Sequence, residues 1–365
     1  MSQSHFSAQG QKKYRWTKKF SLLLVLLALI VSGCRISLGQ RSVSVAGVFR
    51  SADRGENWQT RNLFLHGDGA GTIAGVSVLD LVFDPQDDKA IYLTSESSGL
   101  FYTYDGTKSW QKAEGLGTGR IESVVIDPQN KCVIYATFAN TVRKSFDCNR
   151  TWREVYIDTR SDKTVTALAI DHYNNLIIYA GNVSGDIFKS VDGGSNWQVV
   201  NRLGNRVMKI LVDATDSRII YVATQKKGIF KSLDAGATWF DLNDELKKFS
   251  GALEYRDLIF DQSQPDSLLL VAKYGLLKTE DGGNTWQDIK LITPVASTDI
   301  FAVAINPKNN KEIYYATAST FYKSTDGGQN WITRRLPSNN PAGSLLIDKA
   351  SPNIVYLGMR VPPKK

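Results

Sequence analysis

The chain has 365 residues, of which 42% are hydrophobic and 22% charged, a composition typical of a soluble globular protein with enough apolar residues for a core. Its net charge of +8 is uneven, because residues 1–33 hold five cations and no acid, while the rest has 39 basic and 36 acidic residues, a net of +3. This near balance argues against a nucleic-acid partner.

The N-terminal segment is predicted to be an export signal. A basic stretch ending at Lys19 is followed by an apolar run, residues 20–31, which is too short to span a bilayer and has the length of a signal-peptide core. The run leads into Ser32-Gly33-Cys34, which resembles a bacterial lipobox, although Val31 replaces the more usual Leu.

The lipobox resemblance implies that residues 1–33 are a lipoprotein signal peptide, that Cys34 is lipidated and that residues 34–42 form a tether. The alternative is an ordinary cleaved signal followed by a chance Cys. No second apolar span follows in the sequence. We therefore expect a membrane-anchored lipoprotein on the extracytoplasmic side of a bacterial cell envelope, with the lipid as its only membrane attachment.

Residues 43–360 are built from a repeating unit. Each unit opens with an apolar run that closes on Asp or Asn, as at Asp84, and continues through a turn into a second run such as IIYVAT (219–224). A short loop leads to a third run such as GIFKS (228–232), then to an acidic phrase and a fourth run. The acidic phrases recur 42 to 52 residues apart, a period typical of repeat architectures.

The runs are predicted to be β-strands, because they are four to six residues long, rich in Ile, Val, Tyr and Phe, and separated by turn residues. The first run of a unit is apolar at consecutive positions, for example Leu81, Val82 and Phe83, which indicates burial on both faces. Four-stranded antiparallel units of this kind predict an all-β fold, a single β-propeller.

The two ends of the repeat region predict how the ring closes. Residues 47–51 match a third run, whereas the last runs, ending at Asp348 and Gly358, match a first and a second run. Seven acidic phrases and seven upstream halves therefore give seven blades, one of them assembled from both ends of the chain. The predicted propeller spans residues 43–360, with a tail at 361–365.

The acidic phrase is the motif S-x-D-x-G-x-[TNS]-W, and residues 324–331 are its clearest copy. Gly permits the positive φ of a tight turn, the Asp carboxylate accepts hydrogen bonds from turn amides, and the Trp ring packs on a neighbouring sheet. These roles are structural. The seven phrase carboxylates are Asp53, Asp105, Asp147, Asp192, Asp234, Asp281 and Asp326.

These phrases resemble the Asp-box, or BNR repeat, of sialidases, xyloglucan-hydrolysing glycoside hydrolases, sortilin-type receptors and photosystem II stability/assembly factors. The resemblance covers residues 43–358 and implies that the phrases lie at the blade periphery, away from the central funnel. The second and third copies depart from the pattern at Thr107 and at Cys148-Asn149, so we expect less regular turns there.

Two further cysteines, Cys132 and Cys148, fall in the third unit. Cys132 begins a second strand and Cys148 lies in the turn after the third strand, so antiparallel neighbours place both at the same rim. We expect a disulfide between them; the alternative is two separate buried thiols. No cluster with metal-ligand spacing occurs, and we expect no metal and no cofactor. The glycine-rich segment 67–71 is expected to be a flexible loop.

Catalysis would require two carboxylates facing the funnel, as in glycoside hydrolysis. Alignment of the innermost strands places Asp80 and Asp257 at the same position as Lys209. Asp80 and Asp257 are therefore the candidate catalytic residues, and pairing with Lys209 or Arg256 is the structural alternative. The resemblance argues against an enzyme: sialidases have six blades, and xyloglucanases generally set their cleft between two propellers.

The aligned position three residues before that of Asp80, Lys209 and Asp257 is predicted to lie at the mouth of the funnel opposite the acidic phrases. Arg120 and Arg206 occupy it on one side of the ring, and Glu254 and Asp299 on the other. A mouth of two opposite charges suits protein recognition; solvated loop charge is the alternative.

Together these patterns predict a monomeric, membrane-tethered extracytoplasmic binding or scaffold protein with a protein partner. By analogy with the photosystem II factors, it would assist assembly of membrane or envelope complexes. The alternative from another class is a carbohydrate-active enzyme or glycan-binding propeller that uses the funnel.

Overall fold

The computed structural model describes residues 45–362. The predicted signal peptide, the lipidation of Cys34 and the whole predicted tether, residues 34–42, lie outside the described residues. Within residues 45–362, no helix is long and apolar enough to cross a membrane.

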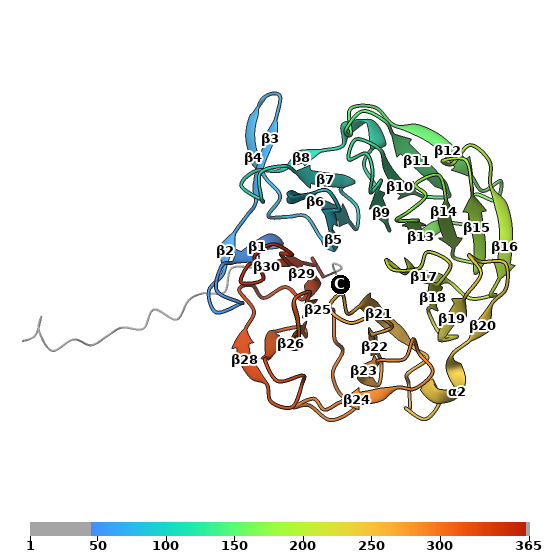
Figure 1. Ribbon diagram of the computed structural model, residues 1–365. Coiled ribbons are helices and arrows are strands. Elements are labelled where there is room, and N and C mark those ends of the chain that lie inside the picture. The colour runs from blue at the N-terminus through green and yellow to red at the C-terminus, as the bar shows by residue number, and fades with distance from the viewer. Residues whose placement is uncertain (1–44, 363–365) are drawn as a thin grey trace, which may run out of the picture. The chain divides into compact units, whose positions relative to one another are not determined.

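Seven four-stranded antiparallel sheets surround a central axis in the described part of the chain (Figure 1). We number them as blades and give the strands from the axis outward. Blade 1 consists of β29 (Ala342–Ile347), β30 (Val355–Met359), β1 (Gly47–Ser51) and β2 (Gln59–Thr60). Blade 2 consists of β5 (Val78–Asp84), β6 (Asp87–Ser95), β7 (Leu100–Thr103) and β8 (Gln111–Lys112). Blade 3 consists of β9 (Val124–Ile126), β10 (Ile134–Phe138), β11 (Thr141–Ser145) and β12 (Arg153–Ile157).

The other four blades follow the same order. Blade 4 consists of β13 (Val165–Ile170), β14 (Ile178–Asn182), β15 (Asp186–Ser190) and β16 (Gln198–Arg202). Blade 5 consists of β17 (Val207–Val212), β18 (Ile220–Thr224), β19 (Ile229–Ser232) and β20 (Phe240–Asp241). Blade 6 consists of β21 (Tyr255–Phe260), β22 (Leu268–Ala272), β23 (Gly275–Thr279) and β24 (Gln287–Ile289). Blade 7 consists of β25 (Ala302–Asn306), β26 (Asn309–Ala316), β27 (Thr320–Ser324) and β28 (Ile332–Arg335).

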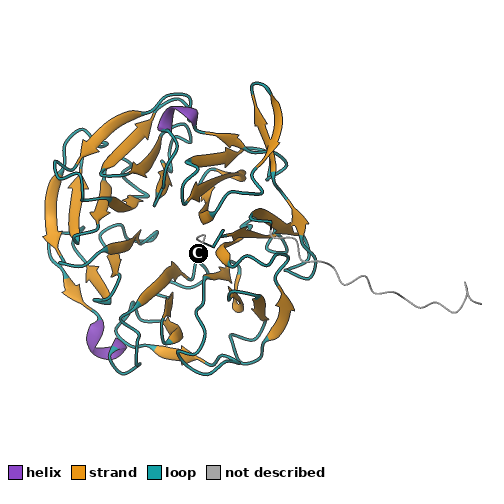
Figure 2. Cartoon of the chain, turned by 180° about the vertical axis from the view of Figure 1, so that it is seen from behind, coloured by secondary structure: helices purple, strands orange, loops and turns teal. Residues whose placement is uncertain are grey.

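The predicted all-β, seven-bladed propeller is thus confirmed. Apart from the strands, the described chain holds only two short helical segments, η1 (Glu114–Leu116) and α2 (Asn243–Leu246), visible among strands and loops in Figure 2. The apolar clusters lie between neighbouring blades; one of them joins Tyr92 and Leu100 of blade 2 to Val124 and Ile134 of blade 3. Each blade is therefore stabilised by the next one around the ring.

Closure of the ring also follows the prediction. In blade 1, β1 pairs antiparallel with β30, Phe49 lying opposite Leu357, and β30 in turn pairs with β29. The first strand of the described chain therefore has its inner neighbours from the C-terminal end, which removes an exposed sheet edge.

One expectation for the loops was wrong. The glycine-rich segment 67–71 is not a free loop: Gly69–Thr72 forms β4, which pairs with β3 (Leu63–His66) in a hairpin that projects from the ring (Figure 1). β3 also joins the outer edge of blade 2, because the Leu65 N–H donates to the Trp110 carbonyl and the Trp110 N–H to that of Leu63. The pairing of β3 with Trp110 of blade 2 therefore orders the glycine-rich segment 67–71, although its glycines by themselves favour a flexible loop.

The acidic phrases form seven turns with one hydrogen-bond pattern, and we call these the acidic turns. In the last copy the Ser324 hydroxyl donates to Asp326 Oδ1 at 2.8 Å, the Asn330 N–H donates to the same oxygen at 2.9 Å, and the Asn330 amide donates to Oδ2 at 2.7 Å. These bonds lower the pKa of Asp326 to about 2. The corresponding bonds occur in the other six copies.

The expectation of less regular second and third turns was therefore also wrong. Thr107 adopts φ 68° and Cys148 and Asn149 adopt φ 58° and 71°, close to the φ of 70° and 93° at Gly282 and Gly283. The Thr107 N–H donates to the Thr103 hydroxyl and the Asn149 N–H to the Ser145 hydroxyl, and these bonds help to hold the turns in the left-handed region in spite of its steric cost for L-residues.

Three acidic turns also accept hydrogen bonds from side chains of the preceding blade. The Tyr135 hydroxyl and the Lys144 ammonium of blade 3 both donate to the Gly193 carbonyl of blade 4, at 3.0 and 2.9 Å. Blades 4 and 5 repeat the arrangement with Tyr179 and Lys189 on Ala235, and with Tyr221 and Lys231 on Gly282. In these three places a backbone carbonyl of the acidic turn connects a blade to the preceding blade through two hydrogen bonds.

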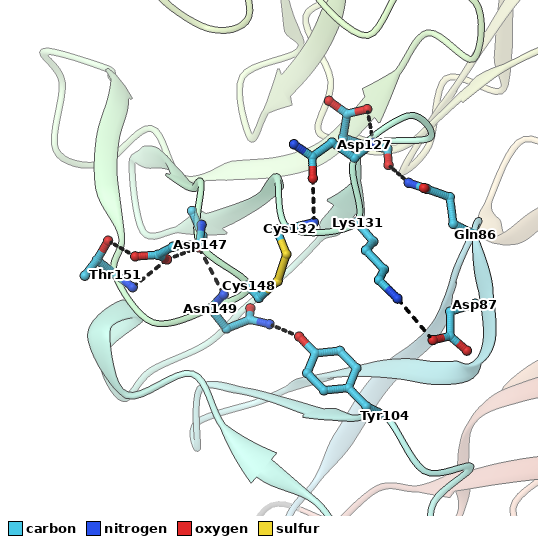
Figure 3. The surroundings of a disulfide bond; sticks show 12 residues. Gln86, Asp87, Tyr104, Asp127, Lys131, Cys132, Asp147, Cys148, Asn149 and Thr151 are labelled. Carbon is cyan, nitrogen blue, oxygen red and sulfur yellow. Dashed lines mark hydrogen bonds and ion pairs between the residues drawn. A yellow bond between two sulfur atoms is a disulfide. The ribbon is translucent and has the colours of Figure 1, made fainter.

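The predicted disulfide between Cys132 and Cys148 is present (Figure 3). It links the turn between β9 and β10 to the acidic turn of the same blade. Nearby, the Asn149 side-chain amide donates to the Tyr104 hydroxyl at 3.0 Å, and Lys131 Nζ lies 3.6 Å from Asp87 Oδ2. Blades 2 and 3 are therefore in contact at this point.

Candidate functional site

The antiparallel blades give the ring two different faces. The acidic turns lie at the same end as the turns between first and second strands, and we call this end the acidic-turn face. The other end, which we call the loop face, carries the loops between blades and those between second and third strands.

A cavity of about 660 Å³ opens on the loop face over blades 3 to 5. It collects residues from the starts of inner strands and from the neighbouring loops. They are Gly119, Arg120, Glu122, Phe138, Ala139, Thr164, Arg206, Met208 and Gln225. We call this cavity the loop-face pocket.

Two predicted binding residues, Arg120 and Arg206, line this pocket from different blades. Both contact Glu122: Arg120 Nε lies 2.8 Å and Arg206 Nη2 lies 2.5 Å from Glu122 Oε1. Arg120 also forms an ion pair with Glu96. One carboxylate between two guanidinium groups fixes the directions in which the remaining N–H groups point.

The pocket also has an apolar wall. Phe138 and Met208 are partly buried and belong to the clusters between blades. The Arg143 guanidinium lies 4.3 Å from the centroid of the Phe138 ring, which holds that ring in place. Polar and apolar groups therefore meet in one concavity, as in many binding sites.

The other two predicted binding residues lie apart from the pocket. Glu254 pairs with Lys273 at 3.1 Å, and Asp299 pairs with Arg256 at 3.3 Å. Neither acid lines the cavity. The charges expected on opposite sides of the mouth are thus each matched by a local partner, and Glu96, Glu122 and Lys273 were the partners that the alignment missed.

The two candidate catalytic residues also have partners. Asp257 Oδ1 lies 3.3 Å from Lys209 Nζ and accepts hydrogen bonds from the Leu258 N–H and the Tyr255 hydroxyl. Asp80 Oδ1 accepts from the Ser344 hydroxyl at 2.8 Å and from the Leu81 N–H at 2.9 Å. The expected pairing of Lys209 with Asp257 is present, whereas Arg256 pairs with Asp299 instead.

The Lys209 ammonium interacts electrostatically with both carboxylates. Burial disfavours its charge, but the attraction of Asp257 and Asp80 raises the pKa of the Lys209 ammonium above its usual range. Burial, together with Asp257, also raises the pKa of the Tyr255 hydroxyl. The inner strands therefore present two hydrogen-bonded carboxylates, of which Asp257 is paired with Lys209.

A further cation, Arg360, comes from the end of the repeat region. The backbone N–H of Arg360 donates to the Pro341 carbonyl, and the backbone N–H of Val361 donates to the Ser77 hydroxyl. Burial lowers the pKa of the Arg360 guanidinium, with repulsion from Arg120 and opposing attraction from Asp80. In the sequence, Arg360 is the last residue of the predicted propeller, and no repeat pattern indicates that it lies near these carboxylates.

Among residues 45–362, no three His, Cys, Asp or Glu side chains come together as metal ligands.

Comparison with protein-family models gave no match. Among curated proteins, 71 residues, 19% of this chain, are 35% identical to a "probable oligoxyloglucan-reducing end-specific xyloglucanase" of Neosartorya fischeri. That segment spans 8% of the fungal protein.

Solved structures share the architecture. The GH74 enzyme of Niastella koreensis aligns over 78% of this chain and 51% of its own, with 18% identity and a TM-score of 0.63. YCF48 bound to D1 peptide aligns over 78% of this chain and 94% of its own, with 16% identity and a TM-score of 0.58. The extracellular domain of the one-component system BT4673 from B. thetaiotaomicron aligns over 80% and 42%, with 14% identity and a TM-score of 0.57.

The fold is shared by all three. At these identities the likeness concerns the seven-bladed propeller alone, and this chain spans about half the length of the glycoside hydrolase. The same architecture thus occurs in enzymes, in a peptide-binding protein and in an extracellular domain.

Proposed function

We propose that this protein is an extracytoplasmic binding or scaffold protein, tethered to the membrane through Cys34, that holds a segment of a partner protein in the loop-face pocket. The observation that carries the proposal is the pocket itself, where Arg120 and Arg206 are positioned around Glu122 beside the apolar wall of Phe138 and Met208. A role in the assembly of membrane or envelope complexes is the specific form that we favour.

Two comparisons support a binding role. YCF48, which this chain matches over nearly the whole YCF48 length, was solved with a bound peptide. BT4673 supplies an extracellular domain of the same architecture. The first agrees with a propeller that binds a peptide, and the second with a propeller that lies outside the cytoplasm.

The experiment that tests the pocket is affinity capture from membranes with a matched control. The double variant Arg120→Ala/Arg206→Ala should lose a protein that the wild type retains, because both guanidinium groups line the pocket. The control Lys311→Ala/Lys349→Ala removes two exposed cations from the acidic-turn face and should retain it. Equal retention by the pocket variant would contradict the proposal.

The lipid anchor has its own test. Cells fed labelled palmitate should label the wild type but not Cys34→Ser, and the variant should leave the membrane fraction. Labelling of Cys34→Ser, or its unchanged association with membranes, would exclude Cys34 as the anchor.

The second candidate function is glycan binding or hydrolysis in the funnel, favoured by the local identity to a xyloglucanase. Asp80 and Asp257 are its candidate residues, and their engagement with Ser344 and Lys209 counts against it. We expect no hydrolysis of xyloglucan oligosaccharides by the wild type. Turnover that disappears in Asp80→Asn/Asp257→Asn would establish the enzyme instead.

A further inference from the structure

Six of the seven blades carry a cationic side chain at one position of the third strand, directly before the Ser or Thr of the acidic phrase. These residues, in blades 1 and 3 to 7, are Arg50, Lys144, Lys189, Lys231, Lys278 and Lys323. Blade 2 has Tyr102 instead. We call this place in the repeat the third-strand cation position, and blade 2 lacks its positive charge.

The cation at this position compensates a buried acid that ends the first strand of its own blade. In blade 6, Lys278 Nζ lies 3.7 Å from Oδ2 of Asp261, a buried side chain. In blade 3, burial lowers the pKa of the Lys144 ammonium and the attraction of Asp127 opposes this effect. Lys144 also donates to the Gly193 carbonyl of the next blade at 2.9 Å. The ammonium therefore lies between a buried carboxylate and an acidic turn, as buried charges require.

Asp84 is the corresponding acid of blade 2. It ends β5, is 1% exposed, and accepts a bond from the Gln86 N–H to its Oδ1 at 2.8 Å. Its Oδ2 is buried and has no hydrogen-bond partner in the described part of the chain. Burial raises the pKa of this carboxyl, because a charge removed from water without a counter-ion is unfavourable.

The side chains beside Asp84 do not supply the missing ammonium. Tyr102 directs its hydroxyl outward and donates to Gln111 Oε1 on β8 at 2.9 Å. Lys131 attracts Asp84 from a distance, but its Nζ lies 3.6 Å from Asp87 Oδ2 and its side chain is 55% exposed. Lys131 therefore compensates Asp87 near the surface and leaves Asp84 Oδ2 without a direct counter-ion.

The acidic turn of blade 3, which contacts blade 2, also departs from the turns that accept Lys bonds. It has Asn149 where those turns have Gly194, Gly236 and Gly283. The Asn149 amide enters the contact between the blades, where its Nδ2 lies 3.0 Å from the Tyr104 hydroxyl (Figure 3) and 3.4 Å from that of Tyr92. Its Oδ1 is buried and, like Asp84 Oδ2, has no hydrogen-bond partner among the described residues.

The charge of Asp84 acts on the same hydroxyl that Asn149 contacts. Burial raises the pKa of the Tyr92 hydroxyl, and Tyr104 and Asp84 add to this effect. In blades 3 to 5, the Tyr at this position of the second strand and the third-strand Lys donate to one carbonyl. The Tyr92 hydroxyl thus marks where an ammonium would lie in blade 2, beside a carboxylate oxygen and an amide oxygen that both lack a donor.

We propose that a monovalent metal cation, sodium or potassium, binds between blades 2 and 3 in place of the missing ammonium. Its ligands are Asp84 Oδ2 and Asn149 Oδ1, with the Tyr92 hydroxyl beside them. A single carboxylate among neutral oxygens matches one positive charge, whereas calcium sites commonly use several carboxylates. The proposal differs from the absence of metal expected from the sequence, and it does not depend on the proposed function.

The test compares the melting temperature of the full chain, in mild detergent, in KCl, NaCl and choline chloride at about 0.15 M each, so that screening is equal. Choline is too large to enter the contact between the blades. The wild type should melt at least about 2 °C higher in KCl or NaCl, because a ligand of the folded state alone stabilises it. Tyr102→Lys supplies the ammonium from the chain itself and should melt at one temperature in all three salts.

Tyr102→Phe is the matched control: it loses the bond to Gln111 but adds no charge, and it should keep the difference between the salts. Asp84→Asn should abolish the difference, and it keeps the proposal testable if Tyr102→Lys does not fold. Crystals grown in RbCl should show an anomalous scattering peak in contact with Asp84 Oδ2.

Three outcomes overturn the proposal. A wild-type chain that melts at one temperature in all three salts would show that Asp84 is held as a neutral acid. A salt difference that persists in Tyr102→Lys or Asp84→Asn, or an anomalous peak elsewhere alone, would place the cation at another site. Stabilisation by CaCl2 but by neither KCl nor NaCl would assign a divalent ion.

Discussion

At the scale of single residues, the phrase carboxylates make the fold sensitive to acid. The pKa of Asp326 is about 2, against 3.8 for an ordinary Asp, because its charged form accepts bonds from Asn330 and Ser324. A lowered folded-state pKa contributes stability that is present above the unfolded pKa and is lost as pH falls through the folded one. The contribution of Asp326 is therefore expected to disappear between about pH 4 and pH 2.

The variant Asp326→Asn should lower the melting temperature at pH 7, because its amide places N–H donors opposite the donating Asn330 side chain. The difference from wild type should narrow as pH falls from 5 to 2. Asp68→Asn, in the exposed turn of the β3–β4 hairpin, serves as the control and should change the melting temperature little at any pH. A gap that stays constant down to pH 2 would contradict the role of the Asp326 charge.

The left-handed residues of the acidic turns offer a stabilising change. Ala235 adopts φ 57°, which costs an L-residue about 1–2 kcal/mol relative to the right-handed region. Ala235→Gly removes this cost and keeps the carbonyl that Tyr179 and Lys189 contact. After the added entropy of Gly in the unfolded chain, we expect a gain of about 0.5–1 kcal/mol in the free energy of unfolding.

Ala350→Gly is the matched control, an exposed turn alanine that is absent from the positive-φ residues. It should lose about 0.5 kcal/mol, because only the entropic cost of Gly applies. Both values are measured by guanidinium unfolding. A loss in both variants would show that the Ala235 backbone is not strained.

At the scale of elements, the disulfide secures the acidic turn of blade 3. Cys132 and Cys148 are 16 residues apart, and closing a loop of this length stabilises a fold by about 3 kcal/mol. Cys132→Ser/Cys148→Ser should lose roughly this amount under non-reducing conditions. Cys132→Ser/Cys148→Gly should lose less, by about 1 kcal/mol, because Gly accepts the φ of 58° at this position. Equal losses would remove backbone strain from the explanation.

Most elements were predictable from local patterns, because each strand carries its own apolar run and each acidic turn its own phrase. The β3–β4 hairpin was not, because the order of Gly69–Thr72 depends on β3. β3 in turn pairs with Trp110 of blade 2, which is distant from the hairpin in sequence. The regularity of the turns at Thr107 and Cys148 was likewise missed. There the hydrogen bonds within the turn, which include those to the Thr103 and Ser145 hydroxyls, outweigh the conformational preference of the residues after the Asp.

At the scale of the whole molecule, the repeat predicted positions but not partners. Aligning the units placed Arg120 and Arg206 on one side of the ring, and both line the loop-face pocket. Pairing of Lys209 with a funnel carboxylate was only an alternative in that alignment, and the structure pairs Lys209 with Asp257. The partner Glu122 precedes β9 of blade 3, two blades from Arg206, which precedes β17 of blade 5, and Arg360 comes from the C-terminal end of the repeat region. Contacts between blades depend on side-chain reach across the ring, which the period of a repeat does not contain.

Ring closure leads to a prediction about the complete fold. A chain that stops after Pro341 lacks β29 and β30, the two inner strands of blade 1, so β1 loses the partner that pairs with it from Gly47 to Ser51. The cluster that joins Leu345 and Leu357 to Tyr314 of blade 7 is lost as well. Since every blade is stabilised by its neighbours, the damage spreads to blades 2 and 7, and we expect no cooperative thermal transition.

The control is a chain that stops after Val361, which keeps all strands and the bond from Val361 to Ser77. It should melt within about a degree of the wild type. Differential scanning calorimetry compares the two, and a peptide of residues 342–361 added to the shorter chain should restore part of the transition if the open ring still offers β1 as an edge. A shorter chain that melts cooperatively at the wild-type temperature would show that the blades do not depend on closure.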